Sequence, residues 1–437
     1  MSVQIFEADW TWTGVRFERG VRVAVDSDGR ICSAAEDERK AQELTGRALL
    51  PGFVNAHSHA FQRGLRARGE RFPVGAGSFW TWREAMYGLV QQMTPERMGD
   101  LCRRAFDEML AAGMTSVGEF HYLHHNDAAA QDHALDTVVL QAARGAGIRI
   151  VLLNAYYSSG GFDVQGGRVP VGMAQARFRT PSPREFWSAF DRLTPELDAA
   201  TQSLGVVVHS LRAADAGELR EIQSEARRRG LVLHIHLEEQ RREVEECQRS
   251  HGMTPMALLL ETLGQTAGDL DNVCAVHCTH TEAGDMARFL AAGGRVCLTP
   301  TTEASLGDGT PDLPGILKGR GALSLGSDSN TRISMFEEMR WAEYAQRLVR
   351  EERGVARNDE EGHIAPTLLR AATVGGAAAL GLPAGDLCEG SHADFLTIDL
   401  DHPILGGVDA EHLPEALALA GDERVIRDVF VGGRQIR

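Results

Sequence analysis

The chain has 437 residues, with 45 Lys or Arg and 61 Asp or Glu, which gives a formal net charge of −16. This length exceeds one small domain and suits a large barrel accompanied by a smaller second domain. The negative charge argues against a nucleic acid or an anionic membrane surface as partner, but it allows a small acidic substrate in a locally basic pocket.

Both ends of the chain, residues 1–48 and 385–437, alternate polar and apolar residues as β-strands do, with Gly and Asp-Gly turns between the strands. The first end contains VQIFEADWTWTG and VRVAVDSDGRI, and the last contains HADFLTIDL and RVIRDVFVGG. Two strand-rich ends around a long middle predict one small discontinuous domain, a β-sandwich built from both termini.

Residues 49–384 follow a different pattern, in which short apolar strands alternate with helical segments. We predict eight strands, at 48–59, 115–123, 147–157, 205–212, 231–239, 272–280, 294–303 and 322–330. Helical spacing of apolar residues marks intervening stretches such as RMGDLCRRAFDEMLAAG and MFEEMRWAEYAQRLVREERG. This alternation predicts a (β/α)8 barrel. A doubly wound sheet is the alternative, but no G-x-G-x-x-G follows the first strand to support it.

Chemically reactive side chains gather at the ends of these strands, where a barrel of this type builds its active site. Four strand ends carry them: His57 and His59, then His236 with Glu239, then His277, then Asp328. Residues i and i+2 of a strand point to the same side, so His57 and His59 can bind one ion. An isolated His-x-His pair is more often a pair of packed or surface residues. Here three other strand ends also carry His, Glu or Asp, which favours an active site.

The predicted metal ligands are His57, His59, His236 and Asp328. Three nitrogens and one oxygen with an open position are typical of catalytic zinc, which lowers the pKa of bound water towards about 7. Fe(II), Mn(II) and Co(II) accept the same ligands. Some barrel hydrolases bridge two metals with a carbamylated lysine on an inner strand. The only lysines here, Lys40 and Lys318, lie away from the strand ends, which favours a single ion.

Longer motifs give a more specific indication. The chain resembles the formimidoylglutamate deiminase family, in the mononuclear aminohydrolase branch of the amidohydrolase superfamily, at NAHSHAFQRGL, SFWTWREAMY, EFHYLHHN, HIHLEEQRREVEEC, TPTTEASLGDG and GSDSNTRISMFEEMRWAEYAQRL. The resemblance runs from about residue 50 to about residue 350. It implies a zinc-dependent enzyme of histidine degradation, which hydrolyses the formimino C–N bond of N-formimino-L-glutamate to N-formyl-L-glutamate and ammonia.

The resemblance also implies a role for each site residue. The metal ligands would be His57, His59, His236 and Asp328, and the catalytic residues Glu239 as proton shuttle, His277 as the group that orients water, and Asp328. The substrate carboxylates would be bound by Gln62, Arg83, Tyr122, His209 and Arg212. The chemistry agrees for the arginines, because a guanidinium binds a carboxylate through two parallel hydrogen bonds. His234 and His280 match no ligand position and are interpreted as supporting or packing residues.

Two alternatives stay open. Another aminohydrolase of the same branch, acting on a nucleobase or guanidino compound, predicts stacking side chains in the pocket and less need for Arg83 and Arg212. A metal-binding scaffold on an inactive barrel is disfavoured, because the ligands, the proton shuttle and the water-orienting histidine are all present. The sequence also does not distinguish N-formimino-L-glutamate from the formimino derivative of aspartate, since one methylene shifts the binding free energy by only about 1–3 kcal/mol.

The remaining expectations concern location and assembly. No apolar run reaches the roughly 18 residues of a membrane span, and no basic segment followed by an apolar one begins the chain. The seven scattered cysteines suit reduced thiols, so we expect a cytoplasmic protein without a membrane partner. The family resemblance implies a homodimer.

Overall fold

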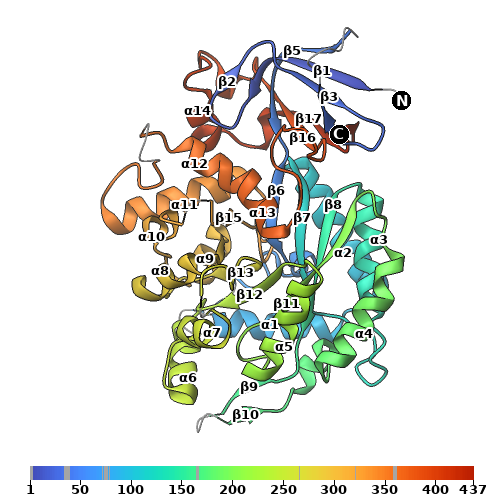
Figure 1. Cartoon of the computed structure of the whole chain (residues 1–437), viewed down its shortest axis with the longest axis vertical. Helices are drawn as coiled ribbons and strands as arrows, with labels where there is room; N and C mark the ends of the chain where they lie inside the picture. The colour runs from blue at the N-terminus through green and yellow to red at the C-terminus, as the bar shows by residue number, and fades with distance from the viewer. Residues whose placement is uncertain are drawn as a thin grey trace.

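A computed structural model of the chain describes residues 3–33, 40–70, 72, 77, 79–163, 167–264, 266–319, 321–357 and 362–437. A barrel surrounded by helices makes up most of it, and a smaller layer of strands, which holds both chain ends, lies at the top of Figure 1. Among the described helices, none has both the length and the apolar character needed to cross a membrane.

The barrel is one parallel sheet whose eight strands follow each other in chain order. They are β6 (Phe53–Ser58), β7 (Met114–His121), β8 (Arg149–Tyr156), β11 (Gln202–Val208), β12 (Leu233–Leu237), β13 (Val273–His277), β14 (Arg295–Leu298) and β15 (Leu323–Leu325). Nearly every strand residue is buried, because one side faces the barrel interior and the other faces helices. The predicted (β/α)8 barrel is confirmed, and the doubly wound alternative is wrong.

The barrel closes between its first and last strands. The backbone N–H of Asp328 donates to the carbonyl oxygen of His57 at 3.0 Å, and the N–H of His59 donates to the carbonyl oxygen of Asp328 at 2.9 Å. A Cβ on Gly326 would lie 2.7 Å from the carbonyl oxygen of His57, so this close approach requires glycine. Closure therefore brings three predicted metal ligands to one place.

The described part of the chain has α-helices, most of them on the outside of the barrel (Figure 1). They are α1 (Phe79–Gln91), α2 (Pro95–Ala111), α3 (Ala134–Ala146), α4 (Pro183–Leu193), α5 (Ala216–Arg228), α6 (Arg241–His251), α7 (Pro255–Leu263), α8 (Ala283–Ala291), α9 (Pro300–Leu306), α10 (Leu313–Leu317), α11 (Met335–Arg350), α12 (Ala365–Arg370), α13 (Gly376–Leu380) and α14 (Leu413–Ala420). Several begin at a side-chain cap, as where Thr94 accepts the Arg97 N–H before α2. The helices predicted within 97–113 and 335–354 correspond to α2 and α11.

Short elements complete the chain. The 3-10 helices are η1 (Ala60–Leu65), η2 (Met173–Phe178), η3 (Thr194–Glu196), η5 (Pro403–Leu405) and η6 (Glu423–Val425), and a π-helical turn, η4 (Ala371–Gly375), joins α12 to α13. The strands β9 (Gly161–Phe162) and β10 (Arg168–Val169) pair in the connection between β8 and β11. Of these, η1 and η2 carry residues that face the cavity described below.

Both chain ends build the second sheet, in the order β18-β17-β16-β5-β1-β3-β4, with β2 on β1. Its strands are β1 (Gln4–Trp12), β2 (Phe17–Glu18), β3 (Arg22–Val25), β4 (Ile31–Cys32), β5 (Gln42–Pro51), β16 (Phe395–Asp399), β17 (Ile426–Val431) and β18 (Arg434–Gln435). Although β16 and β5 separate β17 from β1, the rings of Phe6 and Phe430 lie 5.4 Å apart. The sheet therefore folds over its own core, which confirms the predicted β-sandwich. The domain limits 1–48 and 385–437 stay a prediction.

The strand predicted at 48–59 is two strands. Its first residues belong to β5 in the small sheet, and β6 of the barrel begins only at Phe53. The break falls at Gly52, where a Cβ would lie 2.1 Å from the hydroxyl oxygen of Thr115. Continuous apolar character hid this break, because both halves are buried.

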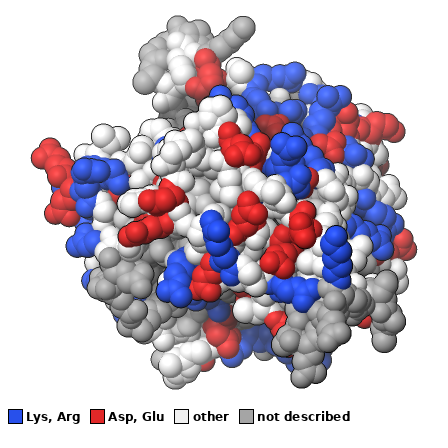
Figure 2. Space-filling view, turned by 90° about the horizontal axis from the view of Figure 1, so that it is seen from above, with Lys and Arg blue, Asp and Glu red and all other residues white. Residues whose placement is uncertain are grey.

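A buried ion pair joins the two parts of the molecule. Arg149, the first residue of β8, donates to Asp394, next to β16, at 2.6 and 3.0 Å. On the face seen in Figure 2, acidic and basic side chains are interspersed, and neither sign forms a continuous patch. The negative net charge is thus not concentrated on that face.

Candidate active site

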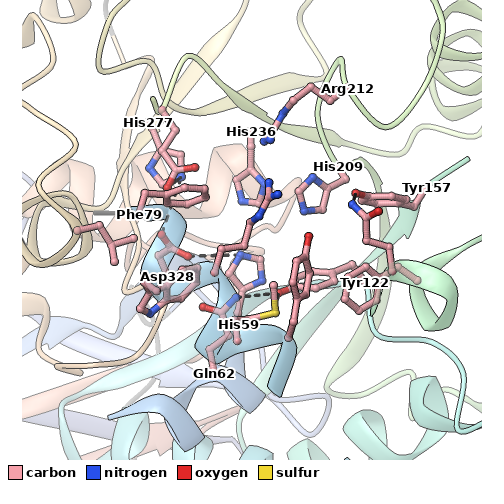
Figure 3. A pocket seen from close by; sticks show the side chains of 18 of the residues that line it. His59, Gln62, Phe79, Tyr122, Tyr157, His209, Arg212, His236, His277 and Asp328 are labelled. Carbon is pink, nitrogen blue, oxygen red and sulfur yellow. Dashed lines mark hydrogen bonds and ion pairs between the residues drawn. The ribbon is translucent and has the colours of Figure 1, made fainter. Parts of the chain in front are cut away.

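One cavity at the carboxyl ends of the barrel strands brings the predicted site residues together. It is lined by His59, Gln62, Arg83, Tyr122, His209, Arg212, His236, Glu239, His277 and Asp328, among others. His57 is fully buried next to them, with its ring centroid 4.8 Å from that of His59. Figure 3 shows the labelled side chains, among them His59, His236 and Asp328, gathered around one space from different strands and from η1.

Four side-chain atoms converge at the base of this cavity. The Nε2 atoms of His57 and His236 lie 3.3 Å apart. Asp328 Oδ1 lies 3.4 Å from His57 Nε2 and 3.3 Å from His59 Nε2. Around a tetrahedral ion with bonds of about 2.0–2.1 Å, ligand atoms lie roughly 3.3–3.4 Å apart. The donor set and these three distances fit a divalent metal ion, and the ligand nitrogens of His57, His59 and His236 all lie within 4.8 Å of one another.

The histidines are neutral and oriented, as metal ligands must be. Burial lowers the pKa of His57 to about 3 and also lowers the pKa values of His59 and His236. The Nδ1–H of His59 donates to the carbonyl oxygen of Phe120 at 2.8 Å, which leaves Nε2 with its lone pair towards the cluster.

Glu239 and His277 lie beside the cluster. Glu239 Oε1 and Asp328 Oδ2 are each 3.9 Å from His277 Nε2. Burial raises the pKa of Glu239 to about 7, so its carboxyl group can accept and return a proton near neutral pH. Burial alone would lower the pKa of His277, but Glu239 and Glu303 raise it to about 10.

The far side of the His277 ring is held by the chain after β14. Its Nδ1 lies 3.1 Å from the hydroxyl oxygen of Thr299 and 3.6 Å from Glu303 Oε1. This contact leaves Nε2 facing the cavity. Sequence reasoning missed both partners, although they lie in the TPTTEASLGDG motif that carried the family resemblance.

The backbone at the strand ends is held in the left-handed region. His277 has φ 74° and Asp328 has φ 47°, and neither is glycine. Such residues cost on the order of 1–3 kcal/mol each, and they persist where the surrounding structure determines them. The turn aims both side chains over the end of the barrel.

Polar atoms around the rest of the cavity are buried without a hydrogen-bond partner among the described residues. They are Gln62 Oε1, Arg83 Nε, His209 Nδ1 and Arg212 Nε. A buried polar group without a partner costs about 1–3 kcal/mol, so a cluster of them indicates a ligand with matching groups. Two guanidinium groups among the four favour an anion. Arg83 comes from α1 and Arg212 follows β11.

Aromatic and amide side chains form the remaining wall, and most were not predicted. The hydroxyl oxygen of Tyr122 accepts from Gln62 Nε2 at 2.8 Å, and that of Tyr157 accepts from Gln175 Nε2 at 2.6 Å. Phe79, Trp82, Tyr87 and Phe178 also line the cavity. Tyr157 directly follows β8, so the strand-end rule could have found it. Gln175 lies in η2, within a connection that gave no signal.

The other conspicuous histidine and cysteines of the sequence lie outside the cluster. His234 Nε2 donates to the carbonyl oxygen of Ala379 at 2.8 Å, on the same side of β12 as His236 but farther from the carboxyl end of the strand. Cys274 and Cys278 are buried with the apolar core. None of these three side chains takes part in the metal cluster.

Comparison with known proteins identifies the family. The model of the amidohydrolase family matches residues 48–436. The chain belongs to this family. It is 38% identical to formimidoylglutamate deiminase of Pseudomonas aeruginosa over 422 residues, which cover 96% of this chain and 91% of that protein. The resemblance inferred from the motifs is thereby confirmed.

The chain is also similar to a more distant relative and to solved structures. The chain is 27% identical to 5-methylthioadenosine/S-adenosylhomocysteine deaminase of Haloquadratum walsbyi, over 86% of this chain and 79% of that one. An amidohydrolase structure from Brucella melitensis superposes with a TM-score of 0.88 at 31% identity, covering 99% and 94% of the two chains. A zinc-bound adenosine deaminase from Xanthomonas campestris has a TM-score of 0.80 at 22% identity, covering 99% and 92%, and supports the fold alone.

The two histidines of β12 give a matched test of the metal site. We expect His236→Gln to lose its bound divalent ion, because it removes one of four converging ligands, whereas His234→Gln should keep one ion per chain. The measurement is the metal content of each variant after gel filtration, by plasma mass spectrometry. Equal metal content in both variants would contradict the ligand set.

Proposed function

We propose that the chain hydrolyses N-formimino-L-glutamate to N-formyl-L-glutamate and ammonia, with one divalent ion, most simply Zn²⁺. The observation that carries the proposal is a single cavity with a His₃Asp cluster at its base and two unpartnered guanidinium Nε atoms on its walls. The 38% identity to formimidoylglutamate deiminase over 96% of the chain supports the same substrate.

The cavity suits a substrate with two carboxylates and an amidine-like head. Arg83 and Arg212 supply paired N–H donors for carboxylates, and His209 Nδ1 and Gln62 add polar contacts. The formimino carbon would then lie near Glu239 and His277, since these line the same cavity. We therefore assign binding of the substrate to Gln62, Arg83, Tyr122, His209 and Arg212.

The ion would be held by His57, His59, His236 and Asp328. A divalent ion in such a site acts as a Lewis acid and lowers the pKa of water towards about 7. Zinc suits three imidazoles and a carboxylate with an open position, while Fe(II), Mn(II) and Co(II) suit them as well.

The protein's own groups move the protons. Glu239 accepts a proton from the attacking water and delivers it to the formimino nitrogen, which its buried, near-neutral carboxyl group suits. His277 Nε2 donates a hydrogen bond to the oxygen that becomes negatively charged in the tetrahedral intermediate. The second proton passes from the hydroxyl group of the intermediate to the same nitrogen through Asp328 or Glu239. The nitrogen leaves as ammonia, and the oxygen of water becomes the formyl oxygen.

A nucleobase or nucleoside deaminase is the second candidate. The aromatic wall around Tyr87, Tyr157 and Phe178 is what stacking on a base would require. The two arginines weigh against it, because a neutral base leaves their buried Nε atoms without an anion. A cytoplasmic location and a homodimer remain predictions.

Ammonia release tests the substrate directly. We expect the purified zinc-loaded chain to release ammonia from N-formimino-L-glutamate faster than from N-formimino-L-aspartate, and to leave adenosine, guanine and guanidino compounds unchanged. A coupled assay for ammonia measures all of them. Turnover of a base without turnover of the formimino compound would transfer the assignment to the second candidate.

Glu239→Gln tests the proton shuttle. We expect kcat to fall by about 10²–10⁴-fold, because general acid–base catalysis contributes that much, while the metal content stays at one ion. Glu238→Gln is a matched control, since Glu238 instead accepts the Met256 N–H at 2.8 Å and does not line the cavity. Loss of the ion in Glu239→Gln would make this residue a ligand rather than a shuttle.

The two arginines can be assigned by pairing enzyme variants with truncated substrates. Arg83→Met and Arg212→Met should each lower kcat/KM by an amount equivalent to about 2–5 kcal/mol, because each leaves a carboxylate unpaired. N-formimino-4-aminobutyrate lacks the α-carboxylate, and N-formimino-2-aminobutyrate lacks the γ-carboxylate. One analogue should make Arg83→Met nearly neutral, and the other should do so for Arg212→Met. Strictly additive losses in all four pairings would refute direct contact.

A further inference from the structure

A second buried cluster lies behind the wall of the active site. Asp136, in the first turn of α3, accepts hydrogen bonds with both carboxylate oxygens. Its donors are His121 Nε2 at 2.9 Å, His124 Nδ1 at 2.8 Å, His133 Nδ1 at 3.3 Å and Asn154 Nδ2 at 3.1 Å. The side chains of His121, His124 and Asp136 are at most 3% exposed.

His121, His124 and Asp136 could in principle hold a metal, but their geometry indicates hydrogen bonds. Their contacts of 2.8–2.9 Å are shorter than the roughly 3.3–3.4 Å between ligand atoms of a tetrahedral ion. His124 also has no free nitrogen, because its Nε2 donates to the carbonyl oxygen of Ala155 at 2.8 Å. In the active-site cluster, by contrast, the distances from Asp328 to His57 and His59 and from His57 to His236 are 3.3–3.4 Å.

The cluster contains a buried charge pair. Both ring nitrogens of His124 face acceptors, Nδ1 the carboxylate of Asp136 and Nε2 the carbonyl oxygen of Ala155. Burial would raise the pKa of Asp136, but the charge of His124 and the histidine hydrogen bonds hold it well below its usual range. The position at the start of α3 also favours a negative charge.

The pair is connected to the active site through β7 and the residue after it. Neighbouring residues in this extended segment point to opposite sides. The ring of Phe120 and that of Tyr122 face the cavity side, where they contact the ring of His59. His121, between them, turns outward to Asp136. The carbonyl group of Phe120 orients His59, and the hydroxyl group of Tyr122 accepts from Gln62.

The same cluster reaches the loop that carries η2. His125 follows His124, and its Nε2 donates to the carbonyl oxygen of Arg179 at 2.9 Å. Arg177 Nε donates back to the carbonyl oxygen of His125 at 2.7 Å. Between these two arginines, Phe178 packs its ring 4.9 Å from that of Tyr122. The wall of the cavity is thus held from behind on both sides of Tyr122.

We propose that Asp136 is a positioning residue for the metal ligand His59 and the wall residue Tyr122, acting through His121 and His124, and that its cluster holds no ion of its own. Its carboxylate fixes the end of β7, and the backbone of that end fixes the ring of His59. The effect on turnover rests on the proposed function, whereas the effect on the ion does not.

The test uses the full chain loaded with Co(II). In Asp136→Asn the amide cannot accept from all four donors, so we expect a changed visible absorption spectrum and release of the ion to a chelator about 10-fold faster, in the range typical of supporting-residue changes. His121→Leu should behave alike, and His121→Gln, which keeps a donor near Nε2, should restore the wild-type spectrum and release rate. KM for N-formimino-L-glutamate should rise in the first two variants, because Tyr122 moves with the strand.

Asp394→Asn separates positioning from general loss of stability. It weakens the buried pair with Arg149 at the opposite end of the barrel, so it should lower the melting temperature but leave the Co(II) spectrum and release rate unchanged. A wild-type spectrum and release rate in folded Asp136→Asn would overturn the positioning role. A second bound ion per chain that disappears in Asp136→Asn would instead make the cluster a metal site.

Failure of this proposal can be distinguished from failure of the proposed function. The spectrum and the release rate involve no substrate. If the wild-type chain does not act on N-formimino-L-glutamate, yet Asp136→Asn alters both measurements, the assigned substrate is wrong and the positioning role stands. If the wild-type chain is active and Asp136→Asn alters neither measurement, the assigned substrate stands and the positioning role is wrong.

Discussion

Closure of the barrel is the constraint on which the site depends. The hydrogen bonds that join β6 to the end of β15 are made by the backbone of His57, His59 and Asp328, whose side chains form most of the ligand cluster. The same residues therefore close the barrel and form the site. A ring of strands that did not close at this point would separate the histidines from the carboxylate. Gly326 is part of the same constraint, because any side chain there would hold the two strands apart.

Alternation along the strands gives the barrel two useful sides. In β12, His234 and His236 are two residues apart and point to the same side, where His236 contacts the cluster and His234 donates to the carbonyl oxygen of Ala379. At the end of β7 the outward residue is His121, and the contact that it makes is with a charge rather than with a carbonyl group. A charge buried behind the wall resists movement, since separating it from its partner leaves it uncompensated in a low-dielectric interior. The buried charge therefore holds in place the strand that orients His59.

The barrel and much of the site could be predicted from the sequence, because strand ends of a (β/α)8 fold meet at one place. That rule alone places His57, His236 and Asp328 together, whatever the loops do. It fails at Gly52, because a chain buried on both sides reads the same when it passes from one sheet to another. It also cannot find Gln175, which reaches the cavity from a connecting segment whose path depends on tertiary contacts.

The site concentrates costs that the rest of the fold offsets. Left-handed backbone at His277 and Asp328 and unpartnered polar atoms on Arg83 and Arg212 each disfavour the folded chain by about 1–3 kcal/mol. The cost of the unpartnered arginine atoms differs from the cost of the left-handed backbone. An anionic ligand that pairs with the guanidinium groups removes the first cost but not the second. Binding energy then comes partly from relief of an existing penalty, and a neutral ligand of the same size cannot supply it. This asymmetry selects for an anionic substrate even though the chain as a whole is strongly acidic.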